Sequence, residues 1–432
     1  MHEGVYKSTI IDDNLDDRVE LGDLCDAIHS RMPLLTHLKV DMFPHPKYLT
    51  PLTGLIKSLP NLTSVELPAF DKVSKILPAV LSLSRLRIMK FNAQLLDKAS
   101  NRVVAVTDIG PYIDSLDVDT RLEFPLELQE IEIYCVSFTA AVGFFRFHGL
   151  SDLVNLRKID LVSNIIEKPS VIRDLFKALS QTCRQITHLE VTYTQGLCSE
   201  IMDDQVENPS SLPVLTSSDI VSFADIRHLL GCTEMVNMNF IHPYGLDITD
   251  EDVTEMATAW PKLRYAGIGS YPARRIDRGI VGSPSFRSFF TFVEKCPFIE
   301  SIYLLVNTTI PFAPPTTHTV PHTLRIVGVG LSEIQDGNEY SVALLLSKLC
   351  GPRCTLTYDV EERFTKLKQK AFRDRWEAVT KLLPLINGLE ARIGEIVEEK
   401  EKEILDLKRE LALAREIIAS RRPICSRPMD FV

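Results

Sequence analysis

The stretch LVNLRKIDL, residues 153–161, indicates how the chain folds, because close variants of it recur along the sequence. It follows an L-x-x-L-x-L pattern at Leu156, Ile159 and Leu161, with a further apolar residue three places earlier. The variants include LPNLTSVEL (59–67), CRQITHLEV (183–191), WPKLRYAGI (260–268) and CPFIESIYL (296–304). A short apolar strand that recurs at a near-fixed interval indicates a unit that buries its hydrophobic face only by stacking on copies of itself.

Ten copies can be aligned along the chain. Their first leucine-like positions are Leu35, Leu62, Leu86, Leu128, Leu156, Ile186, Met235, Leu263, Ile299 and Leu324. Most intervals are close to the leucine-rich repeat length of about 20–29 residues. Between copies, apolar residues three or four apart predict helices at 21–31, 70–83, 170–181, 250–259, 285–295 and 339–349. We therefore predict an α/β leucine-rich-repeat solenoid over residues 21–358, with a curved parallel sheet lining the concave side and helices on the convex side.

Several segments interrupt the regular spacing. Residues 1–20 are acidic and predict a flexible amino terminus. A weak copy at 113–118 leaves the number of regular repeats between Leu86 and Leu128 open. Loop composition at 196–219 and the prolines between 311 and 321 predict insertions in place of helices. The proline spacing also suits an extended ligand of an aromatic groove.

The carboxy-terminal part differs in composition. From Trp376, steps of three and four residues meet an apolar residue at eleven of thirteen positions, as in a coiled coil. The later seam positions are Ile393, Val397, Ile404, Leu407, Leu411 and Ile418. Pro384 and Gly388 predict a break, which would separate a helical cap at 359–387 from a long charged helix at 388–422 and a tail at 423–432. The long helix would pair with a second copy or a partner, or fold back on the solenoid.

Composition narrows the function classes. A net charge of −10 disfavours nucleic-acid binding, which requires a basic surface. The start MHEGVYKSTIIDDNLDD lacks the features of a secretory signal, and no apolar run is long enough to span a bilayer. Nine cysteines without a framework spacing fit reduced thiols. We expect a cytoplasmic or nuclear protein without membrane contact.

No motif for enzyme chemistry is present. The sequence has no P-loop, G-x-G-x-x-G, G-x-S-x-G, H-E-x-x-H or EF-hand spacing, so we expect no catalytic residue and no cofactor. Cys183, Cys232 and Cys296 each stand three residues before a first leucine position, where other copies have a core residue. We therefore interpret them as core residues and expect no metal site.

The outward positions of the strands are the better functional signal. The residue between the last two apolar positions points away from the core, because side chains alternate along a strand. The outward residues at this position and at the neighbouring outward one include Glu66, Glu132, Lys158, Asp160, His188, Glu190, Tyr265 and Tyr303. The carboxylates predict either a negative patch for a basic peptide segment or an ordinary solvated strand face, with Lys158 and His188 as neighbouring counter-charges. The tyrosines suit an interface.

The chain also resembles a known family. The ordered segments are FPLELQEIEI (124–133), LSDLVNLRKIDL (150–161), LFKALSQTCRQITHLEV (175–191), ITDEDVTEMATAWPKLRYAGI (248–268), FVEKCPFIESIYL (292–304) and RWEAVTKLLPLI (375–386). Together they resemble the leucine-rich region of the F-box protein family of basidiomycete fungi. In that family an amino-terminal F-box docks on the Skp adaptor of a cullin–RING ubiquitin ligase, and the repeats hold the substrate. The F-box itself is not visible in this chain, which has no L-P-x-E-I-like opening.

Two functions follow as expectations. The resemblance implies a non-enzymatic substrate-recognition subunit of a cullin–RING ligase, divergent or lacking its F-box. The alternative is a repeat scaffold with a coiled-coil carboxy terminus and no ligase contact. A hydrolase or transferase would instead require a convergent pocket of polar residues with perturbed pKa values.

Overall fold

The computed structural model describes most of the chain. The described residues are 21–42, 45–70, 73–92, 125–135, 137–146, 153–163, 165–193, 219–242, 244, 246–269, 283–310, 323–330, 332–351, 353–358 and 368–420. The acidic start, the weak copy at 113–118, nearly all of 196–219, the proline segment and the 423–432 tail lie outside these residues.

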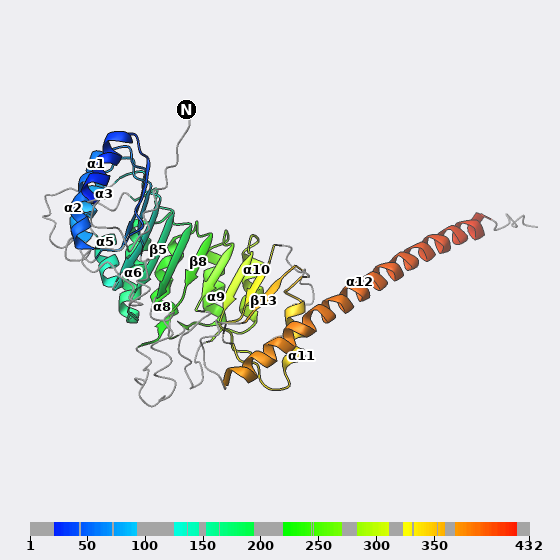
Figure 1. Ribbon diagram of the computed structural model, residues 1–432. Helices are drawn as coiled ribbons and strands as arrows, with labels where there is room; N and C mark the ends of the chain where they lie inside the picture. Colours follow the sequence, from blue (N-terminus) through cyan, green and yellow to red (C-terminus); the bar gives the residue numbers. More distant parts are fainter. Residues whose placement is uncertain are drawn as a thin grey trace, which may run out of the picture.

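One parallel sheet of eleven strands runs through the molecule (Figure 1). Its strands, in spatial order, are β1 (His37–Lys39), β2 (Ser64–Pro68), β3 (Ile88–Asn92), β4 (Glu130–Cys135), β5 (Lys158–Ser163), β6 (His188–Tyr193), β8 (Asn237–Phe240), β10 (Tyr265–Ile268), β11 (Ser301–Leu304), β12 (Ile326–Gly328) and β13 (Thr355–Thr357). Each of the ten predicted copies forms one strand, and β13 is an eleventh that was not predicted. A separate pair, β7 (Val221–Ser222) and β9 (Leu246–Asp247), lies outside this sheet.

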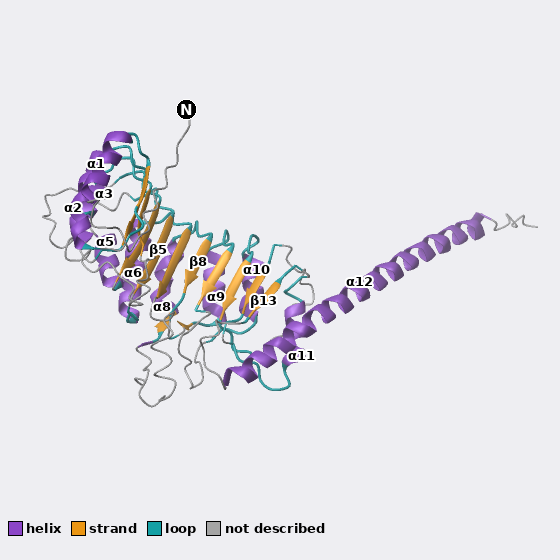
Figure 2. Cartoon of the chain, in the orientation of Figure 1, coloured by secondary structure: helices purple, strands orange, loops and turns teal. Residues whose placement is uncertain are grey.

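Helices cover one face of the sheet, and the other face is open toward the viewer in Figure 2. The helices are α1 (Leu21–Arg31), η1 (Pro46–Tyr48), α2 (Leu49–Ser58), η2 (Val73–Lys75), α3 (Leu77–Leu81), α5 (Phe138–Arg146), α6 (Pro169–Thr182), α8 (Phe223–Ile226), η6 (Arg227–Gly231), α9 (Asp250–Ala259), α10 (Arg287–Lys295), α11 (Glu339–Ser347) and α12 (Lys368–Ser420). The predicted helix at 70–83 is instead the short pair η2 and α3. Pro78 explains the difference, because proline fits the first turn of a helix but not its interior.

The apolar positions of the repeat form a continuous core between the two layers. Ile131, Ile159 and Leu189 align on adjacent strands, and each is no more than 1% exposed. Stacking therefore buries a face that no single repeat could cover. Cys183, Cys232 and Cys296 are fully buried in this core, which confirms their interpretation as core residues.

The predicted break at Pro384 and Gly388 was wrong, because α12 is one helix of 53 residues. Proline removes one backbone donor and crowds the preceding turn. Here Pro384 lies on the exposed side, while Leu383 and Ile386 beside it are buried. The Asn387 side chain also donates to the Cys350 carbonyl at 3.0 Å. Packing on both sides of the proline thus keeps the helix in one direction.

Continuity of α12 makes Gly388 an interior helical residue, and a testable one. A Cβ added at Gly388 would meet no atom within 4 Å. We expect Gly388→Ala to raise the free energy of unfolding by about 0.5–1 kcal/mol, because alanine loses less backbone entropy in a helix than glycine. Urea denaturation of the two proteins measures this change. A destabilised alanine variant would contradict an uninterrupted helix at this position.

Candidate functional site on the open face of the sheet

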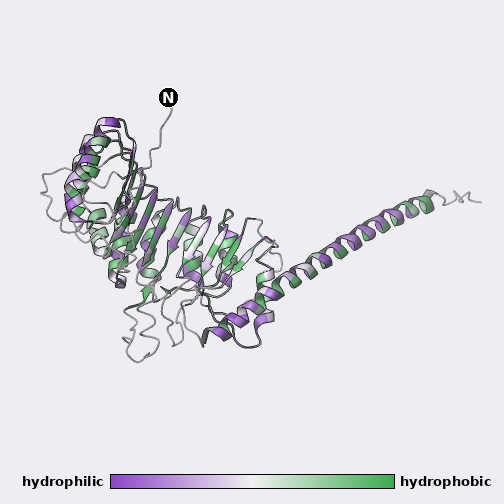
Figure 3. Ribbon diagram, in the orientation of Figure 1, coloured by the Kyte–Doolittle hydropathy of each residue, from purple (hydrophilic) through white to green (hydrophobic). Residues whose placement is uncertain are grey.

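The parallel register collects the outward side chains into two rows across the open face. One row contains Lys39, Glu66, Lys90, Glu132, Asp160, Glu190, Asn239, Gly267, Tyr303, Gly328 and Thr357. The adjacent row contains His37, Ser64, Ile88, Glu130, Lys158, His188, Asn237, Tyr265, Ser301, Ile326 and Thr355. The charged residues gather on β1 to β6. Figure 3 shows purple, hydrophilic residues around β5 and paler or green ones toward β13.

Near β1 to β3 the charges are paired. The Lys39 ammonium lies 3.1 Å from the Glu66 carboxylate. Lys90 reaches two carboxylates of β4, Glu130 at 2.8 Å and Glu132 at 3.5 Å. Burial alone would lower the pKa of Lys90, but its hydrogen bond to Glu130 and the negative charges of Glu130, Glu132 and Glu66 together outweigh burial and raise that pKa. Lys90 therefore stays positively charged at neutral pH.

Glu130 also pairs with a second lysine, Lys158. Lys158 donates to the Glu130 carboxylate at 2.8 Å, on the side opposite Lys90. Burial acts to raise the pKa of Glu130, but hydrogen bonds from Lys158 and Lys90 outweigh it and lower that pKa. The predicted counter-charge, Lys158, is thus bound mainly to a residue outside the predicted set.

An acidic triad follows, formed by Glu132, Asp160 and Glu190 on the adjacent strands β4, β5 and β6. Burial, followed by the negative charges of Glu190 and Glu132, raises the pKa of Asp160 to about 7. Burial also raises the pKa of Glu132, against the effect of Lys90. Within the described part of the chain, Asp160 has no ion-pair or hydrogen-bond partner.

At the far end of the triad, the described residues supply one neutral donor. Asn239 on β8 donates its amide to the Glu190 carboxylate at 3.1 Å. His188 does not neutralise the triad, because burial, and then the charge of Lys158, lower its pKa and leave the imidazole neutral near pH 7. Its Nδ1 lies 2.8 Å from the Thr187 hydroxyl. The lowered pKa thus reduces the counter-charge that His188 can supply to the carboxylates.

A pair of tyrosines lies beyond Asn239. The rings of Tyr265 and Tyr303 are 5.3 Å apart with an interplanar angle of 36°. A Cβ at Gly328 would lie 2.1 Å from the Tyr303 ring, and a Cβ at Gly267 would lie 3.0 Å from the Tyr265 ring. The two glycines therefore let both rings lie close to the backbone of the sheet. The result is an aromatic surface next to the charged one.

The structure divides the eight predicted residues into three groups. Glu132, Lys158, Asp160, His188 and Glu190 lie together on β4, β5 and β6, whereas Glu66 on β2 pairs with Lys39, and the tyrosines form their own group. Sequence reasoning missed Lys90, Glu130, Asn239 and Tyr134. The alternation of strand side chains contained the signal for all of them, since each occupies an outward position.

Tyr134 is the missed residue whose pKa is affected by the triad. Burial raises the pKa of its hydroxyl, and the charges of Glu132, Asp160 and Glu190 raise it further. Its hydroxyl therefore stays protonated at neutral pH. It can donate a hydrogen bond to a ligand or to a carboxylate of the triad.

A second cluster of polar residues has a structural explanation. Glu167 is 5% exposed, and its carboxylate accepts a hydrogen bond from the Phe138 backbone amide at 2.5 Å, at the start of α5. Its backbone carbonyl lies 3.4 Å from Nε2 of His242, whose ring packs on Tyr193. Buried polar groups that join neighbouring repeats in this way specify packing.

The described residues contain no group of three or more histidine, cysteine or acidic side chains suited to a metal ion. Their helices include none with the length and apolar composition needed to cross a membrane. No protein-family model matches the chain. A search of curated proteins likewise found no significant match.

Proposed function

We propose that this chain is a leucine-rich-repeat protein whose open, concave face binds a basic segment of another protein. The observation that carries the proposal is the acidic triad. Three carboxylates lie side by side, and the central one, Asp160, is partly buried and forms no direct ion pair with any described residue. A partly buried carboxylate without a direct partner, such as Asp160, costs folding free energy, and such costs concentrate at functional sites.

A cation supplied by a partner would remove this cost. Adjacent strands lie about 4.8 Å apart, so one lysine or arginine side chain can contact two carboxylates of the triad at once. An ordinary solvated strand face would instead have its carboxylates exposed to water or paired within the protein. Glu66 with Lys39 illustrates that ordinary arrangement on the same sheet.

The tyrosine pair extends the proposed surface. From β4 to β11 there are five strand intervals, or about 24 Å, which an extended peptide of about eight residues spans at about 3.3 Å per residue. A basic residue over the triad would then place a later residue over Tyr265 and Tyr303. Aromatic rings accept both apolar side chains and cations, which suits them to such a contact.

The test uses fluorescence anisotropy with a lysine-rich peptide of that length. Its matched peptide has glutamine in place of every lysine. We expect the wild-type chain to bind the lysine peptide in preference, and Glu132→Gln/Asp160→Asn/Glu190→Gln to lose about tenfold in affinity or more, since each charged contact is worth about 1.5–3 kcal/mol. Replacing the same three residues with lysine should abolish binding.

The control variant removes three carboxylate charges from α12 instead of from the triad. Glu395→Gln/Glu398→Gln/Glu399→Gln neutralises three exposed carboxylates of α12 and should change the affinity less than about twofold, since exposed single charges contribute little. Equal losses of affinity in the two triple variants would mean that binding depends only on net charge, and would refute a specific site.

The resemblance to the F-box family supplies the cellular role in this proposal. The bound protein would be a ubiquitination substrate, and this chain the non-enzymatic substrate-recognition subunit of a cullin–RING ligase. The alternative is a scaffold without ligase contact, which the exposed second half of α12 favours. A pull-down of the Skp adaptor with the full chain separates the two: capture supports the ligase subunit, and its failure supports the scaffold.

A further inference from the structure

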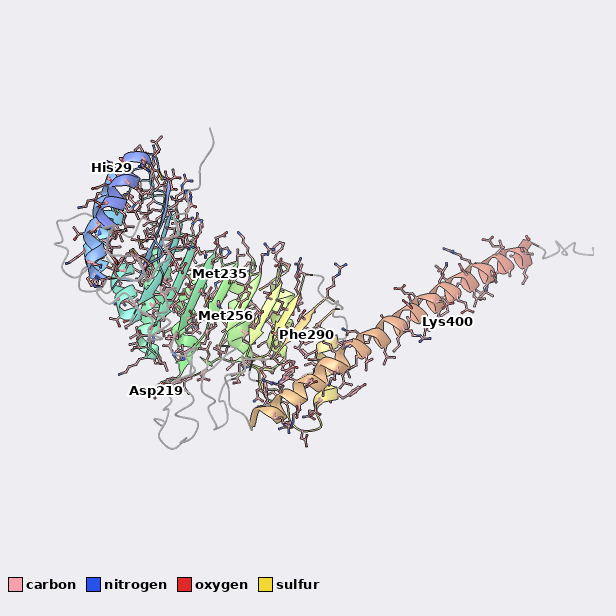
Figure 4. All side chains as sticks on the ribbon, viewed as in Figure 1. His29, Asp219, Met235, Met256, Phe290 and Lys400 are labelled. Atoms are coloured by element: carbon pink, nitrogen blue, oxygen red, sulfur yellow. The ribbon has the colours of Figure 1, made fainter. Side chains whose placement is uncertain are left out.

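The second half of α12 has no tertiary partner among the described residues. Among the described residues, the last polar contacts of this helix with the rest of the chain are Asn387 with Cys350, and Glu390 with Lys348, which directly follows α11. Every residue from 391 to 420 is exposed. This segment extends about 45 Å at about 1.5 Å per residue. Figures 1 and 4 show it projecting away from the sheet, with Lys400 labelled on it.

An apolar stripe runs along this projecting segment. The seam residues Ile393, Val397, Ile404, Leu407, Leu411 and Ile418 are 48% to 64% exposed. Ile396 and Ile417, at flanking positions of the same heptads, are also exposed. The stripe has the period of 3.5 residues typical of coiled coils and lasts about four heptads. A stripe of this length is stabilised when a second helix covers it.

We propose that residues 391–420 pair with the same segment of a second copy of this chain, in an antiparallel coiled coil centred between Ile404 and Leu407. The inference is independent of the proposed function, because no residue of the open face takes part.

The position of the repeats decides the orientation. Trp376, Val379, Leu383 and Ile386 belong to the same stripe and are buried against the end of the solenoid. In a parallel pair, the stripes of both helices would face each other along their whole length. The two solenoids, which cover these stripes before Glu390, would therefore overlap. In an antiparallel pair, each helix ends where the solenoid of the other copy begins.

The side chains match in this register. Ile404 faces Leu407 of the second copy, Val397 faces Ala414, and Ile393 faces Ile418, while Ile396 lies beside Ile417. A parallel pair would set Lys400 against Lys400, whereas the antiparallel pair sets Lys400 against Leu411 of the second copy.

The charged residues that flank the seam form some attractive pairs in each orientation. Glu401 lies beside Lys408 of the second copy in the antiparallel pair, an attractive contact. Glu403 lies near Glu410 of the second copy, with Lys400, which contacts Glu403 at 2.6 Å, available between them. A parallel pair would gain Glu403 with Lys408 and Glu410 with Arg415. Such exposed pairs contribute at most about 1 kcal/mol each, too little to offset the overlap of two solenoids.

Light scattering coupled to size exclusion tests the pairing on the full chain. We expect a mass of twice 48.8 kDa at micromolar concentration for the wild type. Ile404→Glu/Leu407→Glu should give a monomer with unchanged circular dichroism from the repeats. The matched control, Leu405→Glu/Leu413→Glu, introduces the same charges off the seam and should remain a dimer. A monomeric wild type, or equal effects of the two variants, would overturn the proposal.

Cysteine cross-linking tests the orientation. Under oxidation, Ile404→Cys/Leu407→Cys should give a covalent dimer beyond the background of the parent chain, because positions 404 and 407 meet across an antiparallel pair. Leu407→Cys alone should not, since position 407 faces itself only in a parallel pair. A covalent dimer of the single variant would overturn the antiparallel arrangement.

Discussion

Replacing Trp376 with alanine should lower the free energy of unfolding of the carboxy-terminal repeats by about 3–5 kcal/mol, the usual cost of deleting a buried tryptophan. Trp376 is fully buried, donates its indole N–H to the Ser332 carbonyl at 2.7 Å, and stacks on Tyr358. The alanine variant loses the ring, leaves a cavity and orphans an acceptor. Because repeats contact mainly their neighbours, the damage should be local.

Hydrogen exchange measures this local loss. Protection of β12 and β13 should fall in Trp376→Ala, while that of β4 to β6 is unchanged. Leu385→Ala is the control, since Leu385 lies on the same helix but is 65% exposed. Its effect should stay within about 0.5 kcal/mol. Equal protection in Trp376→Ala and the wild type would mean that α12 does not hold the end of the sheet.

Replacing Asp160 with asparagine should stabilise the protein at pH 8 by about 2–3 kcal/mol. The pKa of Asp160 is raised from 3.8 to about 7, so the folded state binds more protons than the unfolded state between those values. The stability of the wild type therefore falls as pH rises through this window. A shift of about three pKa units is worth about 4 kcal/mol, which solvent screening of a partly exposed group reduces.

Urea denaturation at several pH values measures this effect. The difference between Asp160→Asn and the wild type should be near zero at pH 4 and reach its maximum above pH 7. Glu66→Gln is the control and should have the opposite sign, losing up to about 1 kcal/mol, because that carboxylate is paired with Lys39. If Asp160→Asn raised the free energy of unfolding no more at pH 8 than at pH 4, the pKa of Asp160 would not be raised in the folded protein.

These two residues show how far the sequence determines the fold. The recurring apolar triplets predicted ten strands, because each repeat needs its neighbour to cover it. Trp376 fell on the predicted apolar seam and caps the end of the sheet. The continuity of α12 through Pro384 was not predictable, since it depends on buried neighbours at Leu383 and Ile386 that only the packed structure supplies.

The site was predictable in position but not in charge balance. Strand alternation placed Glu132, Asp160 and Glu190 on one face, and the register brought them onto adjacent strands. Which carboxylate each lysine reaches depends on side-chain geometry, and Lys158 lies against Glu130 rather than satisfying the triad. The unpaired state of Asp160 therefore emerges only from the three-dimensional arrangement.

Zero-length carbodiimide coupling of the lysine-rich peptide to the wild-type chain, followed by mapping of the adducts by mass spectrometry, tests whether the acidic triad binds a basic segment. The reagent joins an amine to a carboxylate that it touches. With a labelled peptide we expect labelled adducts at Asp160 and Glu190, and we expect an excess of unlabelled peptide to suppress them. Adducts spread over the exposed glutamates of α12, such as Glu398 and Glu399, with none on β5 or β6, would contradict this expectation.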